Sequence, residues 1–301
     1  MGRLTAIVLG AAAGGGIPQW NCRCDVCRLA WSGDPRVKSR TQASLAVSAD
    51  GEHWALLNAS PDLRAQIQAN SDLHPRGDGR GSPIGAVLLT GAEIDQTAGL
   101  LNLRERSPFT LHGTAATLAA LADNPMFGAL APDVVMRRAI VPGQRFSPVP
   151  GIEAELFLVP GKVPLYLEGD DPDTASESAA NVGIEVCAGP SRLIYVPGAA
   201  AVTPAIRQRF DGADVVMFDG TVLTDDEMIR TGTGTKTGRR MGHMPLEGLD
   251  GSLAALAGLR ARRIFVHINN TNPILIEGSP DRRRIEAAGW EVAEDGLKVV
   301  L

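Results

Sequence analysis

The sequence lacks the features that would place it in a membrane or on nucleic acid. No stretch reaches the ~18 consecutive apolar residues that a membrane-spanning helix needs. Its 29 basic residues are outnumbered by 34 acidic ones, so the net charge is −5 and the pI is near 5.6. This balance gives no electrostatic footprint for nucleic acid, and no RNA- or DNA-binding motif is present. We therefore expect no membrane span and no nucleic-acid partner.

Cysteine is also scarce, with four residues in 301. Arg3 followed by the apolar run Leu4–Ala13 resembles the start of a secretory signal. That run leads without a break into Gly14-Gly15-Gly16, so cleavage near Ala13 would remove what the pattern indicates is the first core strand. We therefore predict a cytoplasmic protein whose cysteines stay reduced.

The sequence does contain enough apolar material for a large core, because 44% of its residues are hydrophobic. Short apolar runs between turn residues predict strands at Thr5–Leu9, Ser44–Val47, Trp54–Leu57, Ala86–Leu89, Ala154–Val159, Val182–Val186, Leu193–Val196, Val215–Phe218, Ile264–Val266 and Lys298–Leu301. Helices are expected at Leu63–Ala69, Thr114–Ala122, Pro204–Arg209, Leu246–Leu259 and Asp281–Ala288. This mixture predicts a layered α/β fold with mixed sheets covered by helices. Neither half has a complete pattern of its own, so we predict a single domain over residues 1–301.

Three of the four cysteines crowd into six residues, as Cys22, Cys24 and Cys27. Thiolates this close in sequence cannot readily pair with one another as disulfides, but their spacing suits three corners of a tetrahedral zinc site. The alternative is three reduced, partly buried thiols, since the second cysteine pair of a full zinc knuckle is missing. Cys187 is interpreted as a small apolar residue in a strand.

Chemically versatile side chains follow three of the predicted strands. Glu93 and Asp95 come after Ala86–Leu89. Asp219 directly follows Val215–Phe218, and His267 directly follows Ile264–Val266. Strands of α/β proteins often deliver functional residues at their carboxyl ends. Because Glu93 and Asp95 lie two residues apart and close carboxylates are tolerated mainly beside a cation, this pattern indicates a metal.

Each of these residues also has a purely structural interpretation. Glu93 and Asp95 suit the cap of a following helix, and Asp219 before a glycine suits a turn. His267 suits a hydrogen-bonded core histidine. Three other histidines lie in exposed or turn contexts, and we assign them no role: His53, His74 and His112.

Two further segments have the composition of cleft loops. His243 lies on a turn flanked by Gly242 and Pro245, where an imidazole is held at a surface or in a cleft. The loop Thr231–Gly238 is rich in Gly and Thr and is followed by Arg239 and Arg240. The alternative for this loop is a solvated linker.

Four motifs resemble the pyrroloquinoline quinone (PQQ) biosynthesis protein B family: Gly10–Cys27, Gly161–Glu168, Met241–Pro245 and His267–Pro273. The resemblance covers nearly the whole chain. It implies membership of the metallo-β-lactamase superfamily, and with it an αββα sandwich that has a metal cleft at one edge of its two sheets.

The sequence departs from the hydrolases of that superfamily, which carry His-x-His-x-Asp-His where this chain has Gly91-Ala-Glu-Ile-Asp-Gln96. A further histidine would fall near Gly161 and a bridging aspartate near Pro197. Loss of these ligands argues against a binuclear zinc centre that makes a nucleophilic hydroxide. The remaining oxygen-rich set better suits one ferrous ion with positions open for dioxygen and substrate, and consists of Glu93, Asp95, Asp219, His243 and His267.

The cysteine cluster resembles the structural zinc site of the superfamily's phosphodiesterase branch. The fourth ligand there is a histidine three residues beyond the last active-site histidine, and the corresponding position here is Asn270. An amide oxygen is a poor zinc ligand, so Asn270 is a weaker candidate for this site than the three cysteines.

The resemblance implies a role in building PQQ from a Glu-Tyr-derived precursor, alongside other PQQ-biosynthesis proteins. Two functions follow from it: an iron- and O2-dependent hydroxylase acting on the tyrosyl ring, or a non-catalytic carrier that moves PQQ or its precursor toward the periplasm. We favour the hydroxylase, because gathered carboxylates and histidines have little use in a carrier. His243 and Asp219 are predicted to be catalytic. The predicted substrate-binding residues are Lys162, Arg239, Arg240 and Gln96.

Overall fold

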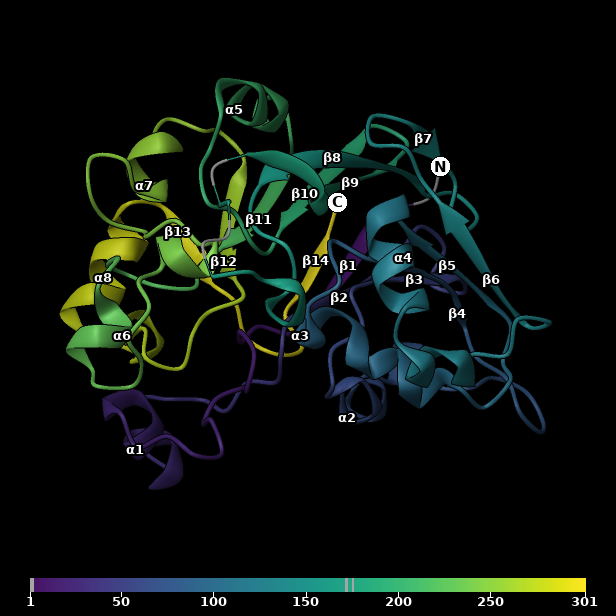
Figure 1. The fold of residues 1–301 in the computed structure, drawn as a ribbon, viewed down its shortest axis with the longest axis horizontal. Coiled ribbons are helices and arrows are strands. Elements are labelled where there is room, and N and C mark those ends of the chain that lie inside the picture. The colour runs from purple at the N-terminus through teal and green to yellow at the C-terminus, as the bar shows by residue number, and fades with distance from the viewer. Residues whose placement is uncertain (1–2, 171–172, 175) are drawn as a thin grey trace.

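Two mixed β-sheets face each other in the computed structural model, which describes residues 3–170, 173–174 and 176–301 (Figure 1). Within these residues each sheet has seven strands. The first runs in the order β14 (Lys298–Val300), β1 (Thr5–Gly10), β2 (Ser44–Ser48), β3 (Trp54–Leu57), β4 (Ile84–Leu88), β5 (Phe109–Gly113) and β6 (Val135–Ala139). The second runs β13 (Trp290–Val292), β12 (Arg262–Val266), β11 (Val215–Asp219), β10 (Ser191–Val196), β9 (Glu177–Ala188), β8 (Glu153–Pro160) and β7 (Arg145–Phe146).

Strand direction decides which residues meet at the sheet edges. In the second sheet β10, β11, β12 and β13 are parallel, and Asp219 at the end of β11 pairs in register with Val266 at the end of β12. In the first sheet β3 to β6 are parallel in the same way. Because parallel strands end at the same edge, Asp219 and His267 are brought together, as their positions after strands predicted.

The helices begin with short caps and cover the outer faces of the sheets. Thr114, Thr203 and Ser279 each accept a hydrogen bond from the first turn, and proline follows at the first helical position after Thr203 and Ser279. The α-helices are α1 (Asp25–Trp31), α2 (Leu63–Ala69), α3 (Ile94–Thr97), α4 (Ala115–Ala122), α5 (Pro204–Phe210), α6 (Glu227–Arg230), α7 (Ser252–Ala255) and α8 (Pro280–Ala287). Short 3-10 turns span Ser71–Leu73, Ala98–Leu103, Pro125–Ala129, Leu165–Leu167, Arg239–Met241 and Pro273–Leu275.

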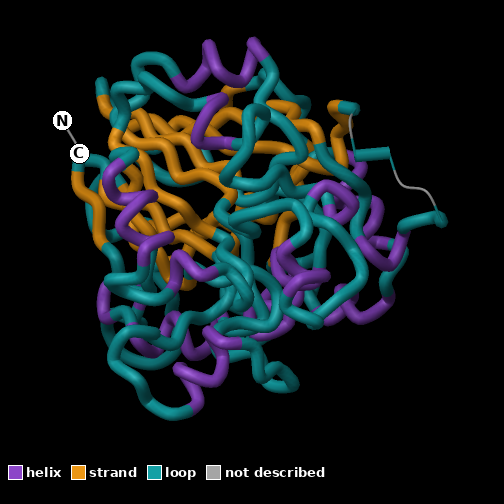
Figure 2. The backbone as a smooth tube through the Cα atoms, turned by 90° about the vertical axis from the view of Figure 1, so that its left-hand side faces the viewer, coloured by secondary structure: helices purple, strands orange, loops and turns teal. Residues whose placement is uncertain are grey.

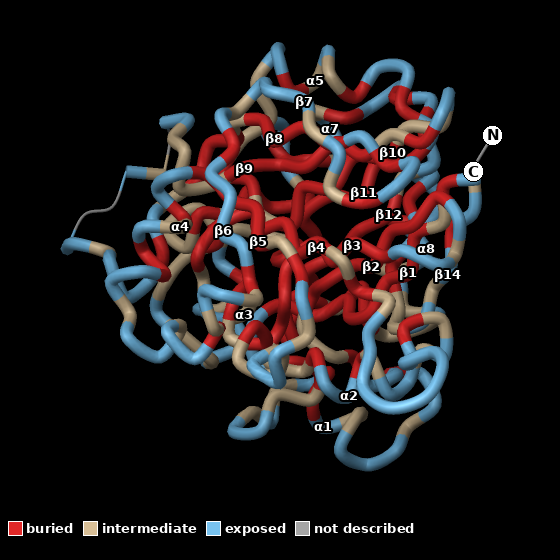
Figure 3. The backbone as a smooth tube through the Cα atoms, turned by 90° about the vertical axis from the view of Figure 1, so that its right-hand side faces the viewer, coloured by how far each residue is buried: buried red, intermediate tan, exposed pale blue. Residues whose placement is uncertain are grey.

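Strand side chains alternate between a central core and two outer ones. On β1, Ala6 and Val8 pack between the sheets, whereas Ile7 and Leu9 pack on the outer face under α2. On β11, Met217 points into the central core and Phe218 packs toward α5, α7 and α8. The strands therefore run through the interior while helical segments lie outside, as Figures 2 and 3 show. This is the four-layered arrangement that the sequence predicts.

Several predicted elements differ in the structure. The helix expected over Leu246–Leu259 is wrong: only α7 is helical there, because Gly248 and Gly258 adopt positive φ values of 103° and 71° that interrupt a helix. The sequence also did not indicate β5, β6, β7, β13 or α1.

The context assigned to His112 is also wrong. This residue lies on β5 with 2% of its surface exposed, and its ring packs 4.9 Å from that of Phe146 on β7 in the other sheet. Phe109 and Leu111 alternate with Thr110 and His112 along β5, so the polar residues concealed a buried strand.

None of the described helices is long and apolar enough to cross a membrane.

Candidate functional site

A cavity of about 490 Å³ lies where the carboxyl ends of the parallel strands meet the loops that follow them. Three of the segments around it were singled out in the sequence: the loop after β4, the turn before Pro245 and the residue after β12. A fourth is the glycine-rich turn after β1. Its polar lining includes Asp95, Lys162, Thr221, Lys236, His243 and His267.

His243 and Asp219 form the first polar pair at the cavity. The Nδ1 atom of His243 lies 2.7 Å from Oδ2 of Asp219. Asp219 is fully buried at the end of β11, and its Oδ2 also accepts a hydrogen bond from the backbone N–H of Ala199 at 3.0 Å. His243 reaches it from the turn that follows the 3-10 segment Arg239–Met241. The two residues predicted to be catalytic are thus in direct contact.

His267 and Asp95 form the second pair. His267 follows β12 with a positive φ of 53°, a conformation that few non-glycine residues adopt. Its Nε2 atom lies 2.9 Å from Oδ2 of Asp95 on α3. The ring of His267 stacks on that of His243 with centroids 5.1 Å apart. Potential ligand atoms of Asp219, His243 and His267 therefore all lie within 4.8 Å of one another.

The hydroxyl of Thr221 joins the two pairs, although no sequence pattern predicts a role for this residue. Its Oγ1 lies 2.6 Å from Oδ1 of Asp219, 3.1 Å from Nδ1 of His243 and 2.9 Å from Nδ1 of His267. It lies two residues beyond Asp219, on the turn that the Asp-Gly sequence forms. Proximity to a strand-end aspartate was the only signal that could have found it.

The charges of these groups stabilise each other. Burial alone would raise the pKa of Asp219, but the charge and hydrogen bond of His243 outweigh burial and hold that pKa below its ordinary value. Burial would likewise raise the pKa of Asp95, but the hydrogen bond from His267 and the charges of His267 and His243 together outweigh burial and lower that pKa. For His267, burial lowers the pKa while the bond to Asp95 raises it, and the net direction is upward. Both carboxylates are therefore ionised near neutrality, as metal ligands must be.

Glu93 lies apart from the pair formed by Asp95 and His267. It caps α3 and pairs with Nζ of Lys162 at 2.7 Å, while Gln96 accepts a hydrogen bond from the Glu93 N–H at 3.2 Å. The structural interpretation of Glu93 as a helix cap is thus confirmed. Lys162 and Gln96 both line the cavity, where the substrate-binding prediction placed them.

Three cations converge on one carboxylate at the cavity wall. Glu168 lies 2.6 Å from Nζ of Lys162, 3.1 Å from Arg240 and 3.5 Å from Lys236. Its side chain is only 6% exposed. Glu168 and Lys236 were not predicted, because neither follows a strand or belongs to a pattern of ligands.

Arg239 does not join this group. Its guanidinium pairs with the exposed Asp250 at 2.7 Å. Neither arginine lines the cavity, but Arg240 is paired with the lining residue Glu168. The two neighbouring arginines diverge because the 3-10 turn that carries them sends successive side chains in different directions.

The three clustered cysteines gather around Asn270. Its Nδ2 atom lies 3.1 Å from Sγ of Cys22, 3.3 Å from that of Cys27 and 3.6 Å from that of Cys24. A half-turn of the amide exchanges its nitrogen and oxygen and would direct the oxygen at the sulfurs. None of the four cysteines, all within the described residues, is in a disulfide. The turn at Asn270 and the loop that leads into α1 thus enclose a sulfur-lined site, as the sequence predicts.

Burial raises the pKa of the Cys24 thiol to about 12, and it raises that of Cys27 as well. Thiols in such a place lose their protons only when a cation replaces them. Backbone N–H groups of Gln19 and Cys24 point at Sγ of Cys27 and Cys22, both at 3.4 Å, and would stabilise the resulting thiolates. The donor set therefore fits a zinc ion.

Comparison with known proteins connects this geometry to a family. Residues 53–268 match the model of the beta-lactamase superfamily domain. Coenzyme PQQ synthesis protein B from Methylorubrum populi is 57% identical over 296 residues, which cover 98% of this chain and 99% of the relative. The protein of the same name from Rhizobium meliloti is 54% identical and covers 99% of this chain and 98% of its own. The chain belongs to the coenzyme PQQ synthesis protein B family.

Solved structures agree with this assignment. A crystal structure of Zn2+-bound PqqB from Methylobacterium extorquens, a member of the PQQ synthesis protein B family, superposes with a TM-score of 0.97 at 56% identity, covering 99% of this chain and all of that one. A diphosphatase of the PhnP family superposes with a TM-score of 0.70 at 19% identity, covering 99% of this chain and 97% of that one, and so shares the fold alone. The predicted metallo-β-lactamase fold is confirmed.

This member of the PQQ synthesis protein B family lacks side-chain ligands where the fold's hydrolases have them. Gly161 and Pro197, the positions at which a further histidine and a bridging aspartate were expected, both line the cavity. Gln96 lines it in place of a third histidine.

Proposed function

We propose that this chain acts in PQQ biosynthesis as an iron- and O2-dependent hydroxylase of the tyrosyl ring in a Glu-Tyr-derived precursor. Relatives named coenzyme PQQ synthesis protein B at 54 to 57% identity support the pathway. One observation supports the chemistry: two histidines and two aspartates meet beside a cavity with no further imidazole among its lining residues.

The donor set favours ferrous iron over a pair of zinc ions. Two imidazoles and a carboxylate with open positions are typical of non-haem iron oxygenases, whereas binuclear hydrolases need more nitrogen ligands. A bound ferrous ion would supply the redox chemistry that activates dioxygen. In the overall reaction one oxygen atom enters the ring C–H bond, and the other leaves as water with two protons and two electrons from an external two-electron reductant.

The residues of the cavity wall suit an anionic substrate of dipeptide size. A volume of about 490 Å³ lies within the usual range for small-molecule sites. Lys162 and Lys236 line the cavity, and Arg240 lies behind them, paired with Glu168. We propose that these cations, with Gln96, orient the substrate carboxylates. We also propose a cytoplasmic location and contacts with other PQQ-biosynthesis proteins, on the basis of the sequence and of the family to which the chain belongs.

We propose that Cys22, Cys24 and Cys27 hold a structural zinc ion, with Asn270 as the fourth partner. The sulfur geometry and the Zn2+-bound relative support this assignment. The two metal sites are chemically distinct, since one offers thiolates and the other imidazoles and carboxylates.

The hydroxylase is tested with protein purified without oxygen and loaded with ferrous iron. We expect consumption of dioxygen that depends on a Glu-Tyr dipeptide and on ascorbate as reductant, and a catechol product by mass spectrometry. Arg240→Gln, which removes a partner of the lining residue Glu168, should raise the apparent KM several-fold with little change in kcat. Arg239→Gln is the matched control, because Arg239 pairs with the exposed Asp250 instead. Binding of PQQ or dipeptide without dioxygen uptake would instead favour the carrier.

A further inference from the structure

Asp219 has no lone pair left for a metal ion. Its Oδ1 accepts hydrogen bonds from the backbone N–H and the hydroxyl of Thr221, at 3.0 and 2.6 Å. Its Oδ2 accepts from the N–H of Ala199 and lies 2.7 Å from Nδ1 of His243. A carboxylate offers about four lone-pair sites, so all are in use. Asp219 is also fully buried and does not line the cavity, unlike Asp95.

The contact with Asp219 decides which nitrogen of His243 carries the proton. An ionised carboxylate only accepts hydrogen bonds, so Nδ1 of His243 must be the N–H that donates to it. In the neutral ring this leaves the lone pair on Nε2. Since His243 lines the cavity, Nε2 is the atom through which it can bind a cation there.

Thr221 fixes the ring orientation of His267 in the same way, with Nδ1 toward the buried side. A hydroxyl has one proton, and the shortest contact of Thr221 Oγ1 is with the carboxylate of Asp219. Its oxygen is then an acceptor for Nδ1 of His267, 2.9 Å away. The other nitrogen, Nε2, lies 2.9 Å from Oδ2 of Asp95, so in the metal-free protein it also carries a proton and donates it to this carboxylate. A cation bound between His267 and Asp95 would replace that proton.

We propose that Asp219 and Thr221 are positioning residues rather than metal ligands. They hold both histidines with Nδ1 toward the buried side, so that Nε2 of His243, Nε2 of His267 and the carboxylate of Asp95 form the cation-binding set. This inference rests on the proposed metal centre and deepens it, because it assigns the carboxylate ligand to Asp95. Hydrogen bonds of this kind, made by the non-coordinating nitrogen, set ring orientation in many metal sites.

The tautomers can be measured directly in metal-free protein. The chain has five histidines, so long-range 1H–15N NMR spectra of histidine-labelled protein can resolve each ring, and His243→Gln identifies the signals of His243. At a pH where this ring is neutral we expect its proton on Nδ1. A proton on Nε2 of His243 would overturn the proposal.

Metal affinity gives a second, independent test. Anaerobic titration with ferrous ion should show binding about 10- to 100-fold weaker in Thr221→Val, which keeps the side-chain shape but loses the hydroxyl. Thr221→Ser, which keeps the hydroxyl, should bind within about 3-fold of the unmodified protein, and Asp95→Asn should weaken binding more than Asp219→Asn does. Equal affinities for Thr221→Val and the unmodified protein, or a larger loss in Asp219→Asn than in Asp95→Asn, would contradict the assignment.

These outcomes are separable from those of the hydroxylase test. Protein that shows the expected tautomer and binds ferrous ion, but forms no catechol, would sink the proposed function and leave the positioning role of Asp219 and Thr221 intact. Circular dichroism of each variant verifies that the fold is retained.

Discussion

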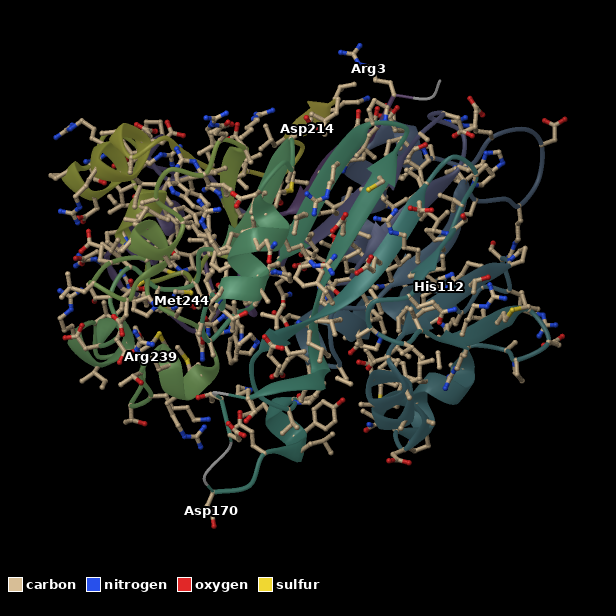
Figure 4. All side chains as sticks on the ribbon, turned by 90° about the horizontal axis from the view of Figure 1, so that it is seen from above. Arg3, His112, Asp170, Asp214, Arg239 and Met244 are labelled. Carbon is tan, nitrogen blue, oxygen red and sulfur yellow. The ribbon has the colours of Figure 1, made fainter. Side chains whose placement is uncertain are left out.

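His112 is a buried histidine whose two ring nitrogens have no hydrogen-bond partner within the described part of the chain. Burial, together with the nearby charge of Arg138, lowers its pKa from 6.5 to about 4. It lies on the far side of the molecule from Met244, the neighbour of His243 (Figure 4), so its titration should affect stability and not the candidate metal centre.

We predict that His112 makes the protein less stable in mild acid. Its pKa is lower in the folded than in the unfolded chain, so the unfolded chain binds more protons between pH 6.5 and 4 and stability falls as the pH drops through this window. The full effect is about 3 kcal/mol, at 1.36 kcal/mol for each pKa unit. Urea unfolding of His112→Leu at several pH values should show a weaker pH dependence, because the titrating group is gone.

The exposed His74 provides a matched control. His74→Leu should keep the pH dependence of the unmodified protein. If His112→Leu and His74→Leu gave the same pH profile, burial of His112 would not be the source of acid sensitivity.

Individual residues of the site were predictable only in part. The positions of Asp95, Asp219, His243 and His267 follow from strand ends and a turn, which are local patterns. Their pairing is not local: 172 residues separate His267 from Asp95. Thr221 and Glu168 carry no chemical signature in the sequence, and only packing reveals that each touches several charged partners.

At the scale of elements, apolar runs in the sequence located the strands whose side chains are buried on both faces of a sheet. Trp54–Leu57 and Leu63–Ala69 match the observed β3 and α2 because apolar composition or helical periodicity is unbroken there. Prediction failed where a polar alternation or a glycine intervened, as in β5 and in the segment around α7. Edge strands such as β6 bury few side chains and so leave little apolar signal.

The loop before α1 is the element that we expect to depend on metal. It lies at the outer edge of the molecule (Figure 1) and contacts the turn at Asn270 through its sulfur atoms. Without a cation, the thiols of Cys24 and Cys27 would stay protonated and the loop would lose the bonds that the metal makes to it.

We predict that Cys27→Ser removes about one zinc ion per chain and lowers the melting temperature by several degrees, because binding energy of a structural metal is folding energy. Elemental analysis and thermal unfolding measure the two effects on the same sample. Cys187→Ser on β9 is the control and should keep its zinc. Unchanged zinc content in Cys27→Ser would show that the ion is held elsewhere.

At the scale of the whole molecule, the two sheets share one central core. Strands from both contribute to it, from Leu45 and Leu57 in the first sheet to Ile184 and Met217 in the second. Segments far apart in the sequence also pair, since β14 is hydrogen-bonded to β1 in the same sheet. A unit that buries both sheets against each other should not unfold in halves, which supports the sequence-based prediction of one domain over residues 1–301.

Two buried tryptophans make this prediction measurable. Trp54 lies on β3 in the first sheet and Trp290 on β13 in the second, whereas Trp20 and Trp31 are exposed. We expect one cooperative transition in each of two variants, one with phenylalanine at 20, 31 and 54 and the other at 20, 31 and 290. At fixed zinc concentration, urea unfolding followed by fluorescence of the remaining tryptophan should coincide with circular dichroism of the whole chain. A fluorescence midpoint displaced from the circular dichroism midpoint, in opposite directions for the two variants, would mean that the sheets unfold separately and that the chain has two cooperative units.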